Sequence, residues 1–206
     1  MGLGVSVGMR SLLEGDPEGL AAFESQLASV NAVLRELGLP DHDESELPDD
    51  ARSRAMLDSF PYSFIHFLRH AHAWALQRPG EPLPSVERLG PDEHKRIERE
   101  LMLFQSHLIV HSDSDGLYVP IDFDEPISDP RLPGGTLGST WALQKELTVI
   151  APLLGVTVVD REVSDDAMAA LDVEDDDPHH REKLVFATLW EACRLSLAHR
   201  CAIVFH

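Results

Sequence analysis

Histidines are the most unusual of the residues that could carry chemistry in this sequence, which has eleven of them among 206 residues. His66 and His70 are four residues apart, a spacing that places both rings on one face of a helix and within reach of one metal ion. His111, Asp113 and Asp115 lie in or beside a segment with turn composition and could add nitrogen and oxygen ligands. These five residues predict a candidate site for zinc, or for manganese or iron where carboxylates dominate.

The same histidines have a simpler interpretation, in which they pack against aromatic neighbours and form local hydrogen bonds. The residues between the first pair are Phe67, Leu68 and Arg69, so the HExxH motif of zinc hydrolases and its general-base glutamate are missing. The positive charge of Arg69 would also oppose a bound cation. A metal-binding protein or metal-dependent hydrolase is therefore kept as the alternative hypothesis.

A second candidate is a glycine-rich loop before an expected helix, where free backbone amides could receive an anion. A phosphate-binding P-loop carries a lysine just before its Ser or Thr, and this loop has none, which favours an ordinary loop with a hydroxyl helix cap. The sequence also lacks the G-x-S-x-G turn of serine hydrolases, so it predicts no catalytic residue. The candidate anion-binding residues are Gly134, Gly135, Gly138, Ser139 and Thr140.

Acidic residues outnumber Lys and Arg by 36 to 17, which leaves a formal net charge of −19 at neutral pH. A surface of this sign repels phosphates, so the composition argues against binding to nucleic acid or to anionic membranes. Two acidic runs could attract a basic protein, as small acidic immunity proteins attract basic toxins, or could simply provide solubility. The candidate partner-binding residues are Asp41, Asp43, Glu44, Glu46, Asp49 and Asp50 in the first run and Asp172, Glu174, Asp175, Asp176 and Asp177 in the second.

Helices dominate the elements expected to position these candidates. Apolar residues at helical spacing predict one helix over about 17–37, with a proline at its first position, and another over about 178–199. Two apolar runs on either side of a turn-like segment predict a β-hairpin within 106–123, and short strands are expected near both termini. We therefore expect one α+β domain over residues 1–206, mostly helical with a small antiparallel sheet, with an acidic loop at 41–50 and a proline-rich loop at 78–91.

Other features favour a cytoplasmic protein. No apolar stretch is long enough to cross a bilayer, and the first residues lack the pattern of a secretory signal. Two cysteines, Cys193 and Cys201, are too few for a disulfide framework. The sequence leaves self-association open.

Four segments resemble an uncharacterised family of bacterial proteins: 58–69 (DSFPYSFIHFLR), 111–123 (HSDSDGLYVPIDF), 138–155 (GSTWALQKELTVIAPLLG) and 191–205 (EACRLSLAHRCAIVF). The resemblance spans residues 58–205 and implies a bacterial, cytosolic setting, but no activity and no catalytic residues. The leading hypothesis is therefore a non-catalytic protein that binds a partner, with a basic protein as the expected partner.

Overall fold

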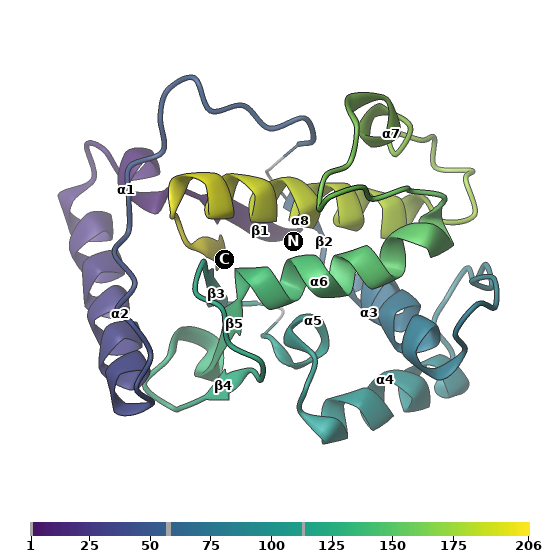
Figure 1. Ribbon diagram of the computed structural model, residues 1–206, viewed down its shortest axis with the longest axis horizontal. Coiled ribbons are helices and arrows are strands. Elements are labelled where there is room, and N and C mark those ends of the chain that lie inside the picture. Colours follow the sequence, from purple (N-terminus) through teal and green to yellow (C-terminus); the bar gives the residue numbers. More distant parts are fainter. Residues whose placement is uncertain (1, 57–58, 113) are drawn as a thin grey trace.

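Figure 1 shows a sheet enclosed by helices in the computed structural model, which describes residues 2–56, 59–112 and 114–206. In these residues the strands form one six-stranded sheet in the order β2-β1-β6-β3-β5-β4. The elements are, in chain order, β1 (Gly2–Val7), α1 (Met9–Leu12), α2 (Pro17–Glu36), β2 (Ser59–Pro61), α3 (Tyr62–Gln77), α4 (Pro91–Leu103), α5 (His107–Val110), β3 (Gly116–Val119), β4 (Ile127–Ser128), η1 (Pro133–Gly135), β5 (Thr136–Ser139), α6 (Thr140–Ile150), η2 (Ala151–Leu154), α7 (Asp165–Ala169), α8 (His180–His199) and β6 (Ile203–Phe205).

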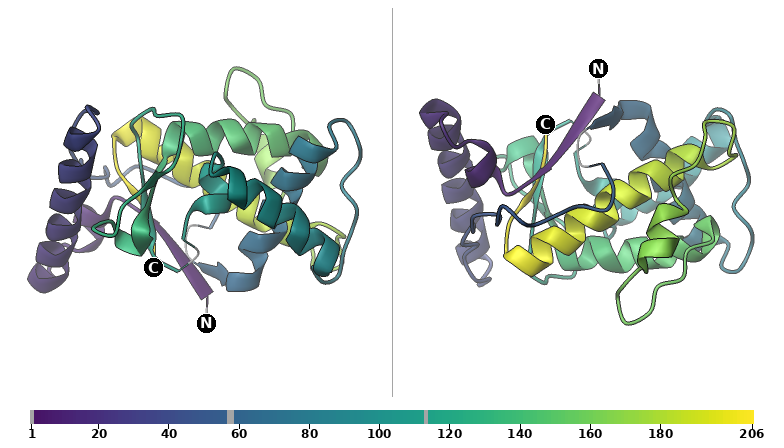
Figure 2. Two further views of the ribbon diagram at one scale, coloured as in Figure 1. Left: turned by 90° about the horizontal axis from the view of Figure 1, so that it is seen from below. Right: turned by 90° about the horizontal axis from the view of Figure 1, so that it is seen from above.

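Helices cover the sheet on both faces, with α2 on one side and α3, α6 and α8 on the other (Figure 2). Successive residues of a strand point to opposite faces. In β3, Leu117 and Val119 pack in the apolar cluster of α2, whereas Tyr118 packs in the cluster that contains α3, α6 and α8. Two apolar clusters, one on each side of the sheet, therefore form the core.

Helix α2 begins where the sequence predicts it. Asp16 accepts a hydrogen bond from the Gly19 backbone amide at 3.0 Å, and Pro17 occupies the first helical turn, where a missing N–H is tolerated. The predicted helix over 17–37 is confirmed. Its buried residues, which recur at helical spacing, are Phe23, Leu27, Val30, Val33 and Leu34.

Helix α8 packs against α3, α6 and β1. Phe186, Leu189 and Trp190 are each 0% exposed, and the helix also buries the carboxylate of Glu191. The predicted helix over 178–199 is confirmed, with its first residue at His180.

The predicted α+β class is confirmed, but two details of the prediction are wrong. The sheet is mixed rather than antiparallel, because β3 and β5 pair in parallel. The hairpin predicted within 106–123 does not form, since His107–Val110 is the one-turn helix α5 and β3 pairs with β5 and β6 instead. The strands near the two termini are confirmed, and they pair with each other as β1 and β6.

A largely buried carboxylate explains why residues 107–110 are helical. Glu146 of α6 accepts hydrogen bonds from the backbone amides of His107 (2.7 Å) and Leu108 (2.8 Å), and Ser106 Oγ accepts one from Ile109 (3.1 Å). These contacts satisfy the free amides at the start of α5. Burial raises the pKa of the Glu146 carboxyl to about 7, and the donated hydrogen bonds act in the opposite direction.

Burial favours the neutral form of four histidines. It lowers the pKa of each to about 4, whereas a histidine in an unfolded chain titrates near pH 6.5. Between these two pH values the unfolded chain binds more protons than the folded protein. The free energy of unfolding contributed by these groups is therefore complete above about pH 6.5 and is lost as the pH falls toward 4. The four residues are His70, His72, His107 and His111.

His70 gives the sharpest test of this effect, because among the described residues neither of its ring nitrogens has a hydrogen-bond partner and its side chain is buried beside Trp74. We expect His70→Leu to raise the free energy of unfolding at pH 5 and to reduce its slope against pH by about 1.4 kcal/mol per pH unit. Urea denaturation at a series of pH values between about 4 and 7 measures both quantities. A variant that is less stable than the wild type at pH 5 and keeps the same slope would contradict this expectation.

Candidate protein-binding surface

The structure does not bring together the four candidate metal ligands that it describes. Within residues 2–56, 59–112 and 114–206, no group of three or more His, Cys, Asp or Glu side chains is placed to hold a metal ion. His66 is half-buried on α3, His70 is buried beside Trp74, and Asp115 is exposed, while Asp113 lies outside the described residues. A metal site at these residues is therefore not supported.

His111 is turned into the core because the expected hairpin is replaced by α5 and β3. Its ring stacks on Tyr118 with 4.0 Å between the ring centroids. Its two nitrogens lie 2.8 Å from the Ser112 carbonyl oxygen and 3.1 Å from that of Leu117. The ring is 3% exposed, so it packs α5 against the sheet and is not open to a ligand.

The glycine-rich segment is also built into the fold. Ser139 is fully buried, accepts a hydrogen bond from the Ala142 amide at 3.2 Å and donates one to the Ile121 carbonyl at 2.7 Å. The start of α6 consequently faces the protein interior and is not open to an anion. The candidate anion-binding residues occupy η1, β5 and the first turn of α6, namely Gly134, Gly135, Gly138, Ser139 and Thr140.

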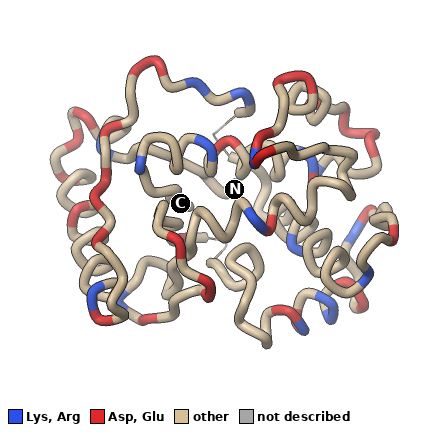
Figure 3. The backbone as a smooth tube through the Cα atoms, viewed as in Figure 1, with Lys and Arg blue, Asp and Glu red and all other residues tan. Residues whose placement is uncertain are grey.

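The acidic residues are concentrated in two parts of the chain. Residues 9–50 hold eleven acids and two arginines, and residues 160–177 hold nine acids and one arginine, so these segments carry formal charges of −9 and −8 out of −19. We call them the first acidic surface (residues 9–50) and the second acidic surface (residues 160–177). Figure 3 shows them at opposite ends of the molecule, with α2 and loop 41–50 at the left and the α7 region at the right.

Loop 41–50 of the first acidic surface alternates between buried and exposed residues. His42 and Glu44 are buried, and their side chains meet at 2.6 Å from Nε2 to Oε2. Asp41, Asp43 and Glu46 are exposed. The buried positions hold the loop on the protein while the exposed carboxylates point to solvent.

Contacts with three other elements fix this loop. Asn31 of α2 bonds to both the carbonyl (2.9 Å) and the amide (2.7 Å) of His42. Glu44 Oε2 accepts the Ala202 amide at 2.7 Å, next to β6, and the Glu44 carbonyl accepts a hydrogen bond from Arg10 of α1. Glu44, although one of the predicted partner-binding acids, therefore serves as an anchor of the loop.

The second acidic surface is attached to α8 through an arginine. Arg54 donates to Glu191 Oε1 at 2.7 Å, to Asp165 Oδ1 at 2.9 Å and to the Val163 carbonyl at 2.8 Å. Glu191 is 0% exposed and also accepts from Arg194 at 2.8 Å. The pKa of Glu191 is lowered, because its hydrogen bonds and ion pairs with the two arginines outweigh the opposing effect of burial.

Most acids of these two surfaces lack a cationic partner among the described residues. In the part of the chain that the structure describes, a large set of them is exposed and lies beyond ion-pair distance of any Lys, Arg or His side chain. They are Glu14, Asp16, Glu18, Asp43, Glu46, Asp49 and Asp50 on the first acidic surface and Asp160, Glu162, Asp166, Asp172, Glu174, Asp175 and Asp176 on the second. Such carboxylates can accept hydrogen bonds from the Lys and Arg side chains of another molecule.

The two acidic runs identified in the sequence contain only part of this set. Glu14, Asp16 and Glu18 begin the first acidic surface, and Asp160 and Glu162 begin the second. These acids are interspersed with apolar and basic residues, so a search for contiguous acidic runs does not find them. A count of net charge over longer stretches of the sequence would have indicated both surfaces.

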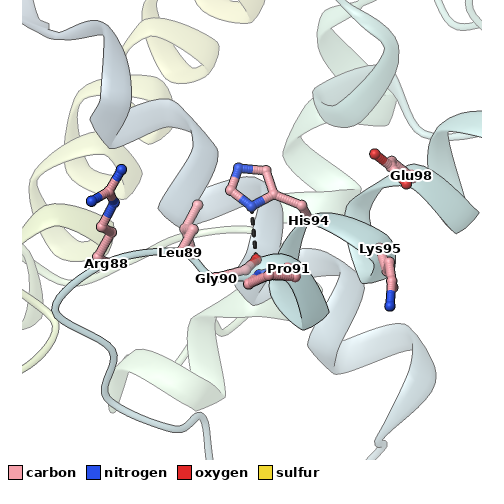
Figure 4. Close-up of a pocket in the computed structure, with 7 residues that line it drawn as sticks. All are labelled: Arg88, Leu89, Gly90, Pro91, His94, Lys95 and Glu98. Atoms are coloured by element: carbon pink, nitrogen blue, oxygen red, sulfur yellow. Dashed lines mark hydrogen bonds between the residues drawn. The ribbon is translucent and has the colours of Figure 1, made fainter.

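A pocket of about 630 Å³ at the start of α4 offers no comparable arrangement (Figure 4). The side chains of Arg88, Lys95 and Glu98 point in different directions in Figure 4. His94 bonds back to the Gly90 carbonyl at 2.7 Å through Nδ1. These groups do not converge on a common point, so the pocket carries no catalytic constellation.

The different roles of neighbouring acids in loop 41–50 can be measured. We expect Glu44→Ala to lower the free energy of unfolding by about 2 kcal/mol, because a buried carboxylate that accepts a backbone amide is lost. The matched change Asp43→Asn should alter it by less than about 0.5 kcal/mol, since Asp43 is exposed. Urea denaturation of both variants measures the two changes in the free energy of unfolding. Equal changes for the two substitutions would show that Glu44 is not an anchor.

The pairing of Glu191 with two arginines gives a second stability test. Glu191→Ala leaves the charges of Arg54 and Arg194 without their buried partner, and we expect a loss of about 3 kcal/mol in the free energy of unfolding. Asp165→Asn removes only the exposed contact of Arg54 and should cost less than about 1 kcal/mol. Thermal and chemical denaturation measure both, and a small loss for Glu191→Ala would refute the expected role of this cluster.

Comparison with known proteins adds one finding to this geometry. No helix in the described residues is both long and apolar enough to span a membrane. Neither the curated proteins nor the solved structures include a significant match to the chain. The model of one protein family matches residues 1–205, a range that includes the segments of the resemblance and both acidic surfaces. The chain therefore belongs to the family described as "Putative DNA-mimic protein".

Proposed function

We propose that this protein binds a basic DNA-binding protein at the surface with which that partner binds DNA. The family description supports the proposal. The observation that carries it is the set of exposed acids on the two acidic surfaces that have no cationic partner within the described parts of the chain. DNA-binding proteins contact phosphates with Lys and Arg, and these contacts supply much of their affinity. Exposed carboxylates offer the same sign of charge to those side chains.

The fixed conformation of the two acidic segments also supports this function. Loop 41–50 is anchored through His42 and Glu44, and the second acidic surface is tied to α8 through Arg54. Acids on an ordered backbone are already in place when the partner arrives, so less conformational entropy is lost on binding. A disordered acidic tail would attract the same partner but would lose more of this entropy.

A basic toxin, bound in the manner of an immunity protein, is the other basic partner that the charge fits. The family description favours the DNA-binding protein. The two partners differ in one measurable respect, because duplex DNA competes only for the DNA-binding surface of a partner.

Competition with DNA tests the proposal. We expect duplex DNA to displace this protein from a basic partner captured from a lysate of the source organism. We expect the affinity to fall steeply as the salt concentration rises. A variant with Glu174→Gln, Asp175→Asn and Asp176→Asn should bind that partner about tenfold more weakly, because it lacks three charges of the second acidic surface. Fluorescence anisotropy with a labelled partner measures each affinity.

A control variant of equal charge separates location from net charge. Asp115→Asn, Asp124→Asn and Glu125→Gln remove the same residue types at exposed positions outside both acidic surfaces. We expect this variant to bind nearly as well as the wild type. Equal losses in the two triple variants, or a bound partner that duplex DNA fails to displace, would overturn the proposed function.

A further inference from the structure

An apolar pocket of about 430 Å³ opens beside the second acidic surface and is lined by residues of α7, α8 and the start of α3. Phe64, Met168 and Leu171 are part of its lining. Met56 and Leu184, which also line it, are 77% and 42% exposed. Large apolar side chains are thus open to solvent at the edge of a strongly acidic surface.

The walls of this pocket are held by contacts within the protein. Thr188 Oγ1 of α8 lies 3.2 Å from the Met56 carbonyl oxygen and 3.0 Å from the Leu184 carbonyl oxygen, and its one hydroxyl proton is shared between them, which places the Met56 segment next to α8. Phe64 of α3 packs edge-on against His180 of α8, with 5.8 Å between the ring centroids. The pocket therefore exists before any partner binds.

The uncompensated charges at the pocket are negative. Asp172 and Asp175 line it, are exposed and have no ion-pair partner among the described residues. Arg54, the arginine of the lining, is already engaged by Glu191 and Asp165. An approaching cation consequently meets free carboxylates, whereas an approaching anion does not meet a free arginine.

Mimicry of DNA by charge does not account for this pocket. Contacts to the DNA backbone are made to phosphates and sugars, which are polar, and an apolar pocket has no counterpart there. A protein segment with one apolar side chain among Lys and Arg fits both features, because the apolar side chain fills the pocket while its neighbours meet the acids.

We propose that this pocket receives a single apolar side chain from a Lys- and Arg-rich segment of the partner, and that this contact selects which basic protein is bound. The inference rests on the proposed function of the acidic surfaces. It adds a contribution that salt does not screen, since apolar burial is independent of counterions, whereas the ion contacts weaken as salt rises.

Two labelled peptides of equal length and equal Lys and Arg content test the inference, one with Trp at its centre and one with Ser there. We expect the wild-type protein to bind the Trp peptide at least about tenfold more tightly than the Ser peptide, and this ratio to persist as salt is raised. Fluorescence anisotropy at several salt concentrations measures both affinities.

Two variants and a control locate the effect at the pocket. Ala169→Trp fills the pocket from the end of α7, and Leu184→Gln makes its lining polar. Both should reduce the Trp-to-Ser ratio to near one without changing the affinity for the Ser peptide. Leu101→Gln changes a leucine of α4 that lies outside the pocket and is 44% exposed, close to the 42% of Leu184, and should leave the ratio intact.

The outcomes separate this inference from the proposed function. If the wild type binds the Ser peptide and gains nothing from Trp, or if the ratio survives in Ala169→Trp, the pocket inference alone is overturned. If neither peptide binds at low salt, or if the Glu174, Asp175 and Asp176 triple variant binds the Ser peptide as tightly as the wild type does, both are overturned.

Discussion

The arrangement of the second acidic surface depends on the pairing of the buried Glu191 carboxylate with Arg54 and Arg194. A buried charge is tolerated only when it is paired and hydrogen-bonded, so this helix residue requires both arginines. Arg54 also donates hydrogen bonds to the Val163 carbonyl and to the Asp165 carboxylate, which lie just before and at the start of α7. The buried charge of Glu191 on α8 thus determines where the segment around Arg54 and the segment that enters α7 run. Both segments contribute to the lining of the apolar pocket, so the same charge also positions the pocket.

The rest of the surface has fewer Lys and Arg side chains than its acids would need for pairing. The chain has 17 Lys and Arg residues for 36 acids, and several of these cations serve the interior. Arg69, for example, donates to the carbonyls of Leu108 and His111. Many surface acids therefore have no ion-pair partner within the described part of the chain. Their mutual repulsion disfavours the compact state, and the apolar clusters on both faces of the sheet offset it.

Three of the residues whose types suggested metal or anion binding serve to build the fold. His111 stacks on Tyr118, Ser139 caps α6, and His70 is buried beside Trp74. Exposed carboxylates on an ordered backbone and an apolar pocket are among the groups that remain available to another molecule. This combination fits recognition of a protein, where charge attracts a basic partner and the pocket distinguishes one partner from another.

Local pattern and composition were sufficient for part of this result. The helix after Asp16, the long helix near the C terminus, the α+β class and the acidic excess all follow from periodicity, capping residues and residue counts. Three other features needed the tertiary structure: helix α5 in place of a hairpin, the burial of Glu44, and the pocket beside the second acidic surface. Each depends on contacts between residues far apart in the chain. Glu146 caps residues 39 positions away, and Glu44 bonds to an amide 158 positions away. No local pattern encodes which distant donor will meet a given carboxylate, so only the folded chain decides which acids hold the structure together and which remain free to bind a partner.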